Sequence, residues 1–325
     1  MKTKAIRIHE HGGPEVLKLE EVEVGDPGPD EVRIRNHAVG LNFIDIYYRT
    51  GLYGAALPHG LGFEGAGMVE AVGSNVKFLK EGDRAAYGQG PLGAYGDVRV
   101  MPAAMVVRLP DKIGFDEGAA VMLKGLTVQY LFRQTYRLQG DETILFHAAA
   151  GGVGLIACQW AQALGVKLIG TVSSDEKAAL AKEHGAWATI NYSQENFVGR
   201  VKELTKGEKV PVVYDSVGKD TWEGSLDCLR PRGLMVSFGN ASGAVTGVNL
   251  GILASKGSLF VTRPTLGTYA VPRSRLETSA EELFDLMLKG KIKVQINQRY
   301  ALADAARAHA DLAARRTTGS TVLVP

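Results

Sequence analysis

The stretch of sequence that decides the fold is residues 143–164, TILFHAAAGGVGLIACQWAQAL. Its opening residues, Thr143–Phe146, predict a short strand, and the apolar run from Leu155 to Leu164 predicts a helix. Small residues fill the turn between them, with Ala148, Gly151 and Gly154 in an Ala-x-x-Gly-x-x-Gly spacing. Small side chains let a backbone approach a pyrophosphate, and the amides at a helix start hold its charge. This segment therefore predicts a dinucleotide site, the alternative being a tight turn that binds nothing.

The residues after this segment continue to alternate between strands and helices. Alternation of this kind predicts a parallel, doubly wound sheet of the Rossmann type. The expected strands are 142–147, 167–172, 188–191, 210–214, 234–238 and 257–262, and the expected helices are 153–164, 175–184 and 221–229.

The first third of the chain has a different character, because short alternating strands are separated by glycine and proline turns. Strands are expected at 4–8, 16–23, 31–39, 67–72 and 84–88. This pattern predicts a compact, curled β domain. The tail, with helices near 279–289 and 303–314 and a strand at 320–324, is expected to pack back on that domain. We therefore assign residues 1–125 and 266–325 to a catalytic domain and residues 126–265 to an inserted Rossmann domain.

The end of the second Rossmann strand bears on which nicotinamide nucleotide binds. An acidic residue at that tip accepts hydrogen bonds from a free ribose 2′-hydroxyl, as NAD requires. Here the strand ends in Ser173-Ser174, without a carboxylate. Asp175 and Glu176 follow at once and favour NAD, unless they serve only as favourable charge in the first helical turn. Lys177 is a candidate partner for the 2′-phosphate of NADP, with a solvated surface charge as the alternative.

Composition excludes several classes of function. The 37 basic and 35 acidic side chains give a net charge of +2 without a basic block, so a nucleic-acid partner is not expected. The charged N-terminus does not resemble a secretion signal, and no apolar run is long enough for a membrane span. Cys158 and Cys228 are too few for a cysteine zinc site or a disulfide framework. These features predict a cytoplasmic protein.

Several motifs carry a family resemblance over almost the whole chain. They are residues 42–53 (NFIDIYYRTGLY), 62–67 (GFEGAG), 124–127 (KGLT), 148–154, 214–218 (YDSVG) and 236–240 (VSFGN). Together they resemble the medium-chain dehydrogenase/reductase superfamily, and more narrowly its bacterial NADPH:quinone oxidoreductases, relatives of zeta-crystallin. The resemblance implies a GroES-like catalytic domain around the Rossmann domain.

The zinc alcohol dehydrogenases of that superfamily hold a catalytic metal with cysteine and histidine. The matching positions here are Asn42, Phe63 and Leu123. Phenylalanine and leucine cannot ligate zinc, and asparagine is a poor ligand beside thiolate or imidazole. The chain also lacks the four-cysteine structural lobe, and Glu64 survives only as what we interpret as a structural carboxylate. We therefore expect no metal and no alcohol oxidation through a metal-bound alkoxide.

The resemblance also implies a set of site residues. At the pyrophosphate it places Ala150, Gly151, Gly152, Val153 and Gly154; at the 2′-phosphate Ser173, Lys177, Tyr192 and Arg316; and at the adenine and ribose Ser216, Phe238 and Asn240. Near the nicotinamide and substrate it places Asn42, Tyr47, Tyr53, Lys124, Thr127 and Arg263. Arg263 and Arg316 lie in weaker motifs and have surface or interface charges as the alternative.

The activity implied is transfer of reducing equivalents from NADPH to a quinone in the interdomain cleft. The Asn42 amide and the Tyr47 hydroxyl are the expected hydrogen-bond donors to the quinone oxygen, because negative charge develops there. Two alternatives remain open. One is reduction of the double bond of an enone or alkenal, and the other is a non-catalytic NADPH-binding protein with a structural or RNA-associated role.

Residues 257–262 suggest how two chains associate. The segment Ser258-Leu259-Phe260-Val261-Thr262 is apolar and is expected to form the last strand of the Rossmann sheet. An exposed apolar edge strand is a template for pairing with another chain. Together with the resemblance, this predicts a homodimer in which the strand pairs with its symmetry mate.

Overall fold

The computed structural model describes all 325 residues, which divide into two compact units. One unit comprises Met1–Leu126 and Ala270–Pro325, and the other comprises Thr127–Tyr269. The second unit is thus inserted in the sequence of the first, and the expected boundaries after residues 125 and 265 lie close to these divisions. We call them the catalytic unit and the nucleotide unit.

The nucleotide unit is built on a six-stranded sheet in which all neighbouring strands are parallel. Its strands are β9 (Thr143–Phe146), β10 (Lys167–Val172), β11 (Ala188–Asn191), β12 (Val210–Asp215), β13 (Leu229–Ser237) and β14 (Phe260–Thr262). Their spatial order is β11-β10-β9-β12-β13-β14. This order reverses direction between β9 and β12, which is the point where ligands bind in doubly wound sheets. The α/β fold class predicted from the alternation is confirmed.

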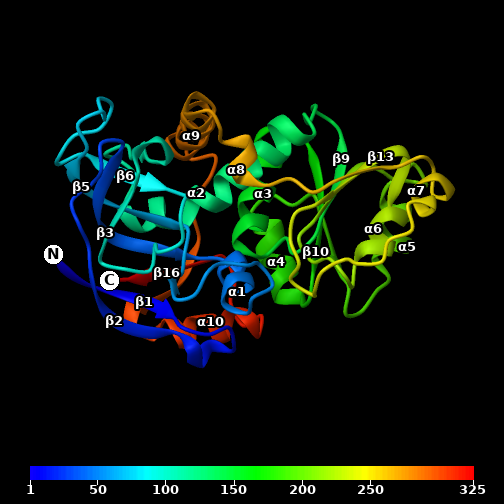
Figure 1. The fold of residues 1–325 in the computed structure, drawn as a ribbon. Helices are drawn as coiled ribbons and strands as arrows, with labels where there is room; N and C mark the ends of the chain where they lie inside the picture. Colours follow the sequence, from blue (N-terminus) through cyan, green and yellow to red (C-terminus); the bar gives the residue numbers. More distant parts are fainter. The chain divides into compact units, whose positions relative to one another are not determined.

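Helices cover both faces of this sheet. They are α3 (Gly152–Ala163), α4 (Asp175–Glu183), α5 (Phe197–Leu204), α6 (Trp222–Asp227) and the short α7 (Gly251–Ser255). Figure 1 shows α3 and α4 on one side of the sheet and α5 and α6 on the other. Between the sheet and α5 and α6 lies an apolar core with Leu145, Val201, Val213 and Leu226. Burial on both faces explains why β12 is apolar from Val210 to Tyr214.

The catalytic unit is dominated by antiparallel strands. A three-stranded sheet has the order β2-β1-β4, and a seven-stranded sheet has the order β15-β16-β3-β5-β6-β8, with β7 paired to β3. The bounds are β1 (Lys2–Ile8), β2 (Lys18–Glu23), β3 (Glu31–Leu41), β4 (His59–Gly60), β5 (Glu64–Val72), β6 (Arg84–Tyr87), β7 (Val98–Pro102), β8 (Val107–Arg108), β15 (Ile296–Ala301) and β16 (Ser320–Val324). The C-terminal strand β16 pairs with β3, so the tail completes the sheet begun by the first third of the chain.

The remaining helices include three that the sequence did not predict, at residues 43–49, 115–130 and 266–269. The helices are α1 (Phe43–Arg49), α2 (Phe115–Tyr130), α8 (Leu266–Tyr269), α9 (Arg273–Leu288) and α10 (Ala305–Ala313), with 3-10 turns at Pro14–Val16, Ala103–Met105 and Leu302–Asp304. The α2 helix continues into a π-helical turn at Leu131–Thr135. Its buried residues occur consecutively, as at Ala119–Met122, so it has no amphipathic stripe to signal a helix. None of the helices is both long and apolar enough to cross a membrane.

The expected last strand, residues 257–262, is shorter than predicted. In the structure β14 begins only at Phe260. Gly257 and Ser258 have φ values of 114° and 55°, in the left-handed region, so the chain turns there before it enters the sheet.

Candidate active site

The turn between β9 and α3 has the close packing that a pyrophosphate loop requires. Ala148 adopts a left-handed conformation with φ 57°, and Gly151 stands at the N-cap of α3. A Cβ atom at Gly154 would overlap the Ala148 carbonyl oxygen, so only glycine fits there. The helix starts at Gly152, one residue earlier than predicted. Ala150, Gly151, Gly152, Val153 and Gly154 therefore lie together at a helix N-terminus, where backbone amides favour an anion.

The tip of β10 carries the residues expected to distinguish the two nucleotides. Lys177 Nζ lies 3.4 Å from Ser173 Oγ, so the lysine ammonium reaches back to the end of the strand. Asp175 is engaged elsewhere: its two carboxylate oxygens accept hydrogen bonds from Asn191 Nδ2 (2.8 Å) and Gln194 Nε2 (3.2 Å). These bonds hold the pKa of the Asp175 carboxyl below its usual value. The Lys177 ammonium therefore lies at the tip of β10, and the Asp175 carboxylate is bound to side chains at the end of β11 and in the loop after it.

The other two members of this set, Tyr192 and Arg316, lie in different units. Tyr192 follows β11, where its backbone N–H donates to Val172 O (3.1 Å) and its side chain is exposed. Arg316 belongs to the catalytic unit, where it forms an ion pair of 2.6 Å with Asp311.

Ser216, Phe238 and Asn240, the expected adenine and ribose contacts, lie on two adjoining loops. The backbone N–H of Phe238 donates to Asp215 O (2.8 Å), and that of Ala241 donates to Ser216 O (3.2 Å). A Cβ atom at Gly239 would overlap Ser216 O, so the two loops are in close contact. The loops after β12 and β13 thus form one surface beside the switch point of the sheet.

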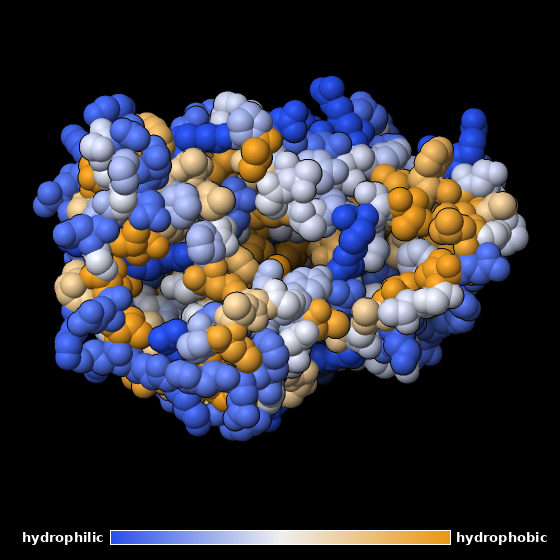
Figure 2. Space-filling view, viewed as in Figure 1, coloured by the Kyte–Doolittle hydropathy of each residue, from blue (hydrophilic) through white to orange (hydrophobic).

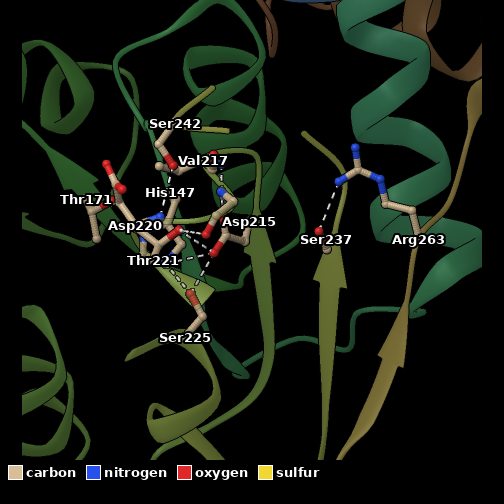
Figure 3. Close-up of polar contacts among 11 residues, drawn as sticks. His147, Thr171, Asp215, Val217, Asp220, Thr221, Ser225, Ser237, Ser242 and Arg263 are labelled. Atoms are coloured by element: carbon tan, nitrogen blue, oxygen red, sulfur yellow. Dashed lines mark hydrogen bonds and ion pairs between the residues drawn. The ribbon is translucent and has the colours of Figure 1, made fainter. Parts of the chain in front are cut away.

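A buried hydrogen-bond network joins the strand ends beneath these loops (Figure 3). His147, directly after β9, contacts Thr171 Oγ1 on β10 through Nδ1 and Ser225 Oγ on α6 through Nε2, both at 2.9 Å. The Ser225 hydroxyl donates to Asp215 Oδ2 at the end of β12 (2.8 Å). Asp215 also accepts from the Thr221 hydroxyl (2.7 Å) and from the backbone N–H groups of residues 217 and 218 (2.7 and 3.0 Å).

This network determines that Nε2 of the His147 ring carries a hydrogen. Ser225 has a single hydroxyl hydrogen and donates it to Asp215, so its oxygen must accept from His147 Nε2–H. In the neutral ring Nδ1 is then the acceptor for the Thr171 hydroxyl. Burial lowers the pKa of His147, although the nearby Asp215 carboxylate acts in the opposite direction. We call His147, Thr171, Ser225 and Asp215 the strand-end network.

Arg263 and Thr127 are the two expected nicotinamide or substrate residues that lie in the nucleotide unit. Arg263 donates from Nη1 to Ser237 Oγ (3.0 Å) and to Gly239 O (2.9 Å), so it braces the end of β13 (Figure 3). Thr127 is buried on α2 and is hydrogen-bonded to Tyr130.

Asn42, Tyr47, Tyr53 and Lys124 lie in the catalytic unit. Asn42 is the N-cap of α1, and its backbone N–H donates to Asp45 Oδ2 (2.8 Å) in a capping box. Tyr47 lies one turn further along α1, and its ring meets that of Tyr53 edge-on at a centroid distance of 5.2 Å. The structure therefore brings Asn42, Tyr47 and Tyr53 onto one short helix and the loop that follows it.

Glu64 connects Asn42 with Lys124. Its Oε2 accepts from Asn42 Nδ2 and from Lys124 Nζ, each at 2.8 Å, and its Oε1 accepts from the Leu123 backbone N–H, also at 2.8 Å. Glu64 has no exposed surface and Lys124 is 4% exposed, so this is a buried ion pair. The sequence identified Glu64 only as a structural carboxylate and did not show what it binds.

A second series of buried hydrogen bonds connects two residues of α1, Arg49 and Asp45, through His309 and Tyr95. Arg49 Nη1 lies 3.1 Å from His309 Nδ1, so Nδ1 accepts and His309 Nε2–H donates to the Tyr95 hydroxyl oxygen (3.1 Å). The Tyr95 hydroxyl donates to Asp45 Oδ2 (2.7 Å). Burial raises the pKa of Asp45 to about 7, and Oδ1 of this residue has no partner. Burial, followed by the charge of Arg49, lowers the pKa of His309 to about 3.

The positions that match zinc ligands in the wider family are occupied by side chains with other contacts. Asn42 binds Glu64, and the Phe63 ring packs against that of Tyr48 with centroids 5.2 Å apart. The chain has no group of three or more histidine, cysteine, aspartate or glutamate residues placed to hold a metal ion.

Comparison with known proteins gives one consistent family. The zinc-binding dehydrogenase family matches residues 152–285, and the alcohol dehydrogenase GroES-like domain family matches residues 28–111. The chain is 68% identical to a quinone oxidoreductase of Pseudomonas aeruginosa over 99% of each chain. It is 44% identical to a 2-haloacrylate reductase of Burkholderia over 98% of each chain.

A solved structure shows the same likeness in three dimensions. It is the Escherichia coli quinone oxidoreductase in complex with NADPH, with a TM-score of 0.98 and 57% identity over 99% of this chain and all of that one.

Proposed function

This chain belongs to the medium-chain dehydrogenase/reductase family, and we propose that it is a quinone oxidoreductase that uses NADPH. The observation that carries the proposal is the likeness to quinone oxidoreductases over almost the entire length of both units. The substrate is a small molecule, and we assign it to the quinones.

NADPH fits the nucleotide unit because of the side chains at the tip of β10. The Lys177 ammonium would pair with the 2′-phosphate, with Ser173 and Tyr192 beside it. Asp175, which could otherwise accept a ribose hydroxyl as in NAD enzymes, is engaged with Asn191 and Gln194. The loop 150–154 would hold the pyrophosphate at the start of α3.

The chemistry divides between cofactor and protein. Bound NADPH supplies the reducing equivalents. Asn42 and Tyr47 would donate hydrogen bonds to the quinone oxygen as it gains negative charge, with Tyr53, Lys124, Thr127 and Arg263 completing the surroundings. An amide nitrogen carries two hydrogens, so Asn42 keeps one for the quinone after it has bound Glu64. The protein's contribution is alignment of the reactants and exclusion of water.

The reaction in this proposal needs no zinc. Phe63 and Leu123 have no ligating atoms in their side chains, and Asn42 is held by Glu64. The oxygen of the substrate would be polarised by hydrogen bonds instead of by a metal ion.

The test is an acceptor comparison with the purified protein. Steady-state oxidation of NADPH is measured with a quinone and with a 2-haloacrylate, in the presence and absence of a chelator. We expect faster turnover of the quinone and no loss of rate in the chelator. No oxidation of NADPH with any quinone tested would contradict the proposal, and a rate restored only by added zinc would contradict the metal-free mechanism.

Reduction of a carbon-carbon double bond is the second candidate, and the 44% identity with a reductase of 2-haloacrylate favours it. This reaction would take its reducing equivalents from the same cofactor. It would also need hydrogen-bond donors at an oxygen that gains negative charge. Higher kcat/KM for the haloacrylate than for the quinone in the acceptor comparison would make this the better assignment.

We further propose that the protein acts as a cytoplasmic homodimer. Both cysteines are free thiols, which suits a reducing compartment. The strand β14 pairs only with β13, which leaves its other edge open, and Phe260 and Val261 on it are 60% and 40% exposed. Figure 2 shows apolar surface near α7, where Leu250 is 74% exposed. Pairing of two β14 strands would cover this surface.

Light scattering at micromolar concentration tests the association. We expect twice the mass of one chain, and a charge placed on the edge by Val261→Lys should shift the equilibrium to monomers. A parent protein that is monomeric at these concentrations would contradict the dimer.

A further inference from the structure

Glu64 is a buried charged group that the proposed reaction does not yet use. It opens β5 and reaches three donors with two oxygens: the Leu123 backbone N–H at Oε1, and both Asn42 Nδ2 and Lys124 Nζ at Oε2. Two of the three donors belong to residues placed at the substrate by the proposed function. All of these groups lie in the catalytic unit.

The Glu64 carboxylate fits in the fold because a glycine, Gly40, lies beside it. A Cβ atom at Gly40 on β3 would overlap both Glu64 Oε2 and the Ala119 carbonyl oxygen of α2. Glycine therefore lets the carboxylate lie between the sheet and the helix that carries Lys124. The position of Glu64 is set by packing on both sides.

A carboxylate at position 64 determines the orientation of the Asn42 amide and the charge of the Lys124 side chain. It can only accept hydrogen bonds, so the Asn42 amide must turn its nitrogen toward Glu64. Asp45 binds the backbone N–H of the same residue, so Asn42 is held at its main chain and at its side chain. Lys124 is 4% exposed, and a buried ammonium needs a nearby counter-charge.

This cluster contains one ammonium group and two carboxyl groups. Lys124 is the cation, Glu64 binds it directly, and Asp45 is near enough for both charges to influence its pKa, with Lys124 lowering it and Glu64 raising it. Tyr95 adds a hydroxyl that donates to Asp45. After binding Glu64, Asn42 retains one amide hydrogen and Lys124 retains two ammonium hydrogens for other acceptors.

We propose that Glu64 is a positioning residue for quinone reduction, which orients the Asn42 amide and holds Lys124 as a charged donor. This inference rests on the proposed function. Glu64 acts through its two partners, and neither the quinone nor NADPH needs to touch it. Orientation of a donor before the reaction removes the cost of reorganising it during the reaction.

The central variant is Glu64→Gln, which keeps the shape of the side chain. Either orientation of the glutamine amide would oppose its NH₂ group to at least one of the three donors. We expect kcat/KM for the quinone to fall at least tenfold and the dissociation constant of NADPH to change less than twofold. Glu70→Gln, in the same strand but paired with Arg33 and Arg35, is the matched control and should change both constants less than twofold.

A mutant cycle separates positioning from a general structural role. The substitution Glu64→Gln is made in the parent and in the Asn42→Ala/Lys124→Met background, where both partners are gone. If Glu64 acts through them, its tenfold effect shrinks to less than twofold in that background. Binding of the quinone to the NADP⁺ complex is measured in the same four proteins. These binding constants complete the mutant cycle for variants whose turnover is too slow to measure.

Folding of the single variant is checked by its unfolding midpoint. If Glu64→Gln does not fold because Lys124 is left unpaired, Lys124→Met is compared with Glu64→Gln/Lys124→Met, in which no unpaired ammonium remains. The quinone constants should still differ at least threefold through Asn42.

Three results are distinguishable. A parent that reduces quinone while Glu64→Gln loses less than threefold overturns the positioning role, and so does an equal loss in both backgrounds. If the parent protein does not oxidise NADPH with any of the quinones tested, the proposed function is overturned, and this inference with it.

Discussion

The two units bury polar groups in opposite ways. In the nucleotide unit, the strand-end network contains one carboxylate, Asp215, whose partners are hydroxyl and backbone N–H groups around a neutral His147. In the catalytic unit, the Glu64 carboxylate and the Lys124 ammonium are buried beside Asn42. The Asp45 carboxyl group binds the Asn42 backbone and is linked through Tyr95 and His309 to the buried Arg49. The first arrangement supports loops that are expected to bind a nucleotide, a ligand that carries its own charged phosphates. In the proposed function, the second places charged groups near the atoms on which the reaction develops charge.

Removing the carboxylate of the strand-end network should give the largest effect on stability. Asp215→Ala takes the acceptor from four donors, of which the Ser225 hydroxyl and the Gly218 N–H are buried, so we expect a loss of about 5 kcal/mol in the free energy of unfolding. Urea denaturation measures it, with the exposed Asp220→Ala as control. A loss below about 1 kcal/mol would show that the network does not hold the strand ends.

The catalytic unit should instead show a dependence of stability on pH, because Asp45 is buried and its pKa is raised to about 7 from 3.8. The folded protein binds this proton more tightly than the unfolded chain does, so stability falls as pH rises between these two values. The loss approaches about 4 kcal/mol above pH 7, since each pKa unit corresponds to about 1.4 kcal/mol.

Asp45→Asn mimics the protonated side chain and should remove this dependence. Its amide oxygen can still accept from the Asn42 N–H and from Tyr95, with the NH₂ group at the position of the unpartnered Oδ1. Unfolding free energies at pH 5, 6, 7 and 8 are compared for the two proteins. Parallel curves would mean that Asp45 is already ionised at pH 5 in the folded state.

The sequence predicted the two units unequally, and for a physical reason. Strands 167–172, 188–191 and 320–324 were predicted to the residue because local hydrophobicity and turn signals define them. The nucleotide loop was visible because it is one continuous stretch. The buried charges were not, since Glu64 meets Lys124 across 60 residues and Tyr95 meets His309 across 214. Residues His147 and Asp215 lie inside motifs that were recognised, but nothing local reveals that Ser225 joins them.

The cofactor preference gives a smaller effect, confined to the nucleotide unit. In the proposed assignment, Lys177→Ala removes one charge-assisted hydrogen bond to the 2′-phosphate, of about 1.5–3 kcal/mol, so NADPH should bind about tenfold more weakly or worse. NADH should be scarcely affected. Dissociation constants are measured at one salt concentration, because exposed ion pairs are screened, and Lys182→Ala on the same helix is the control. Equal weakening of both nucleotides would contradict the assignment of Lys177.

The most direct test of the separate roles of the strand-end network and the Glu64 cluster is to measure nucleotide binding and turnover for both Ser225→Ala and Glu64→Gln. Dissociation constants for NADPH and NADH, and kcat with quinone at saturating NADPH, are determined for both variants. Ser225→Ala cuts the link between His147 and Asp215, so we predict that both nucleotides bind severalfold more weakly by the same factor, with kcat nearly unchanged. Glu64→Gln should lower kcat with nucleotide binding unchanged. If both variants shift nucleotide affinity and kcat together, the two networks do not have separate roles.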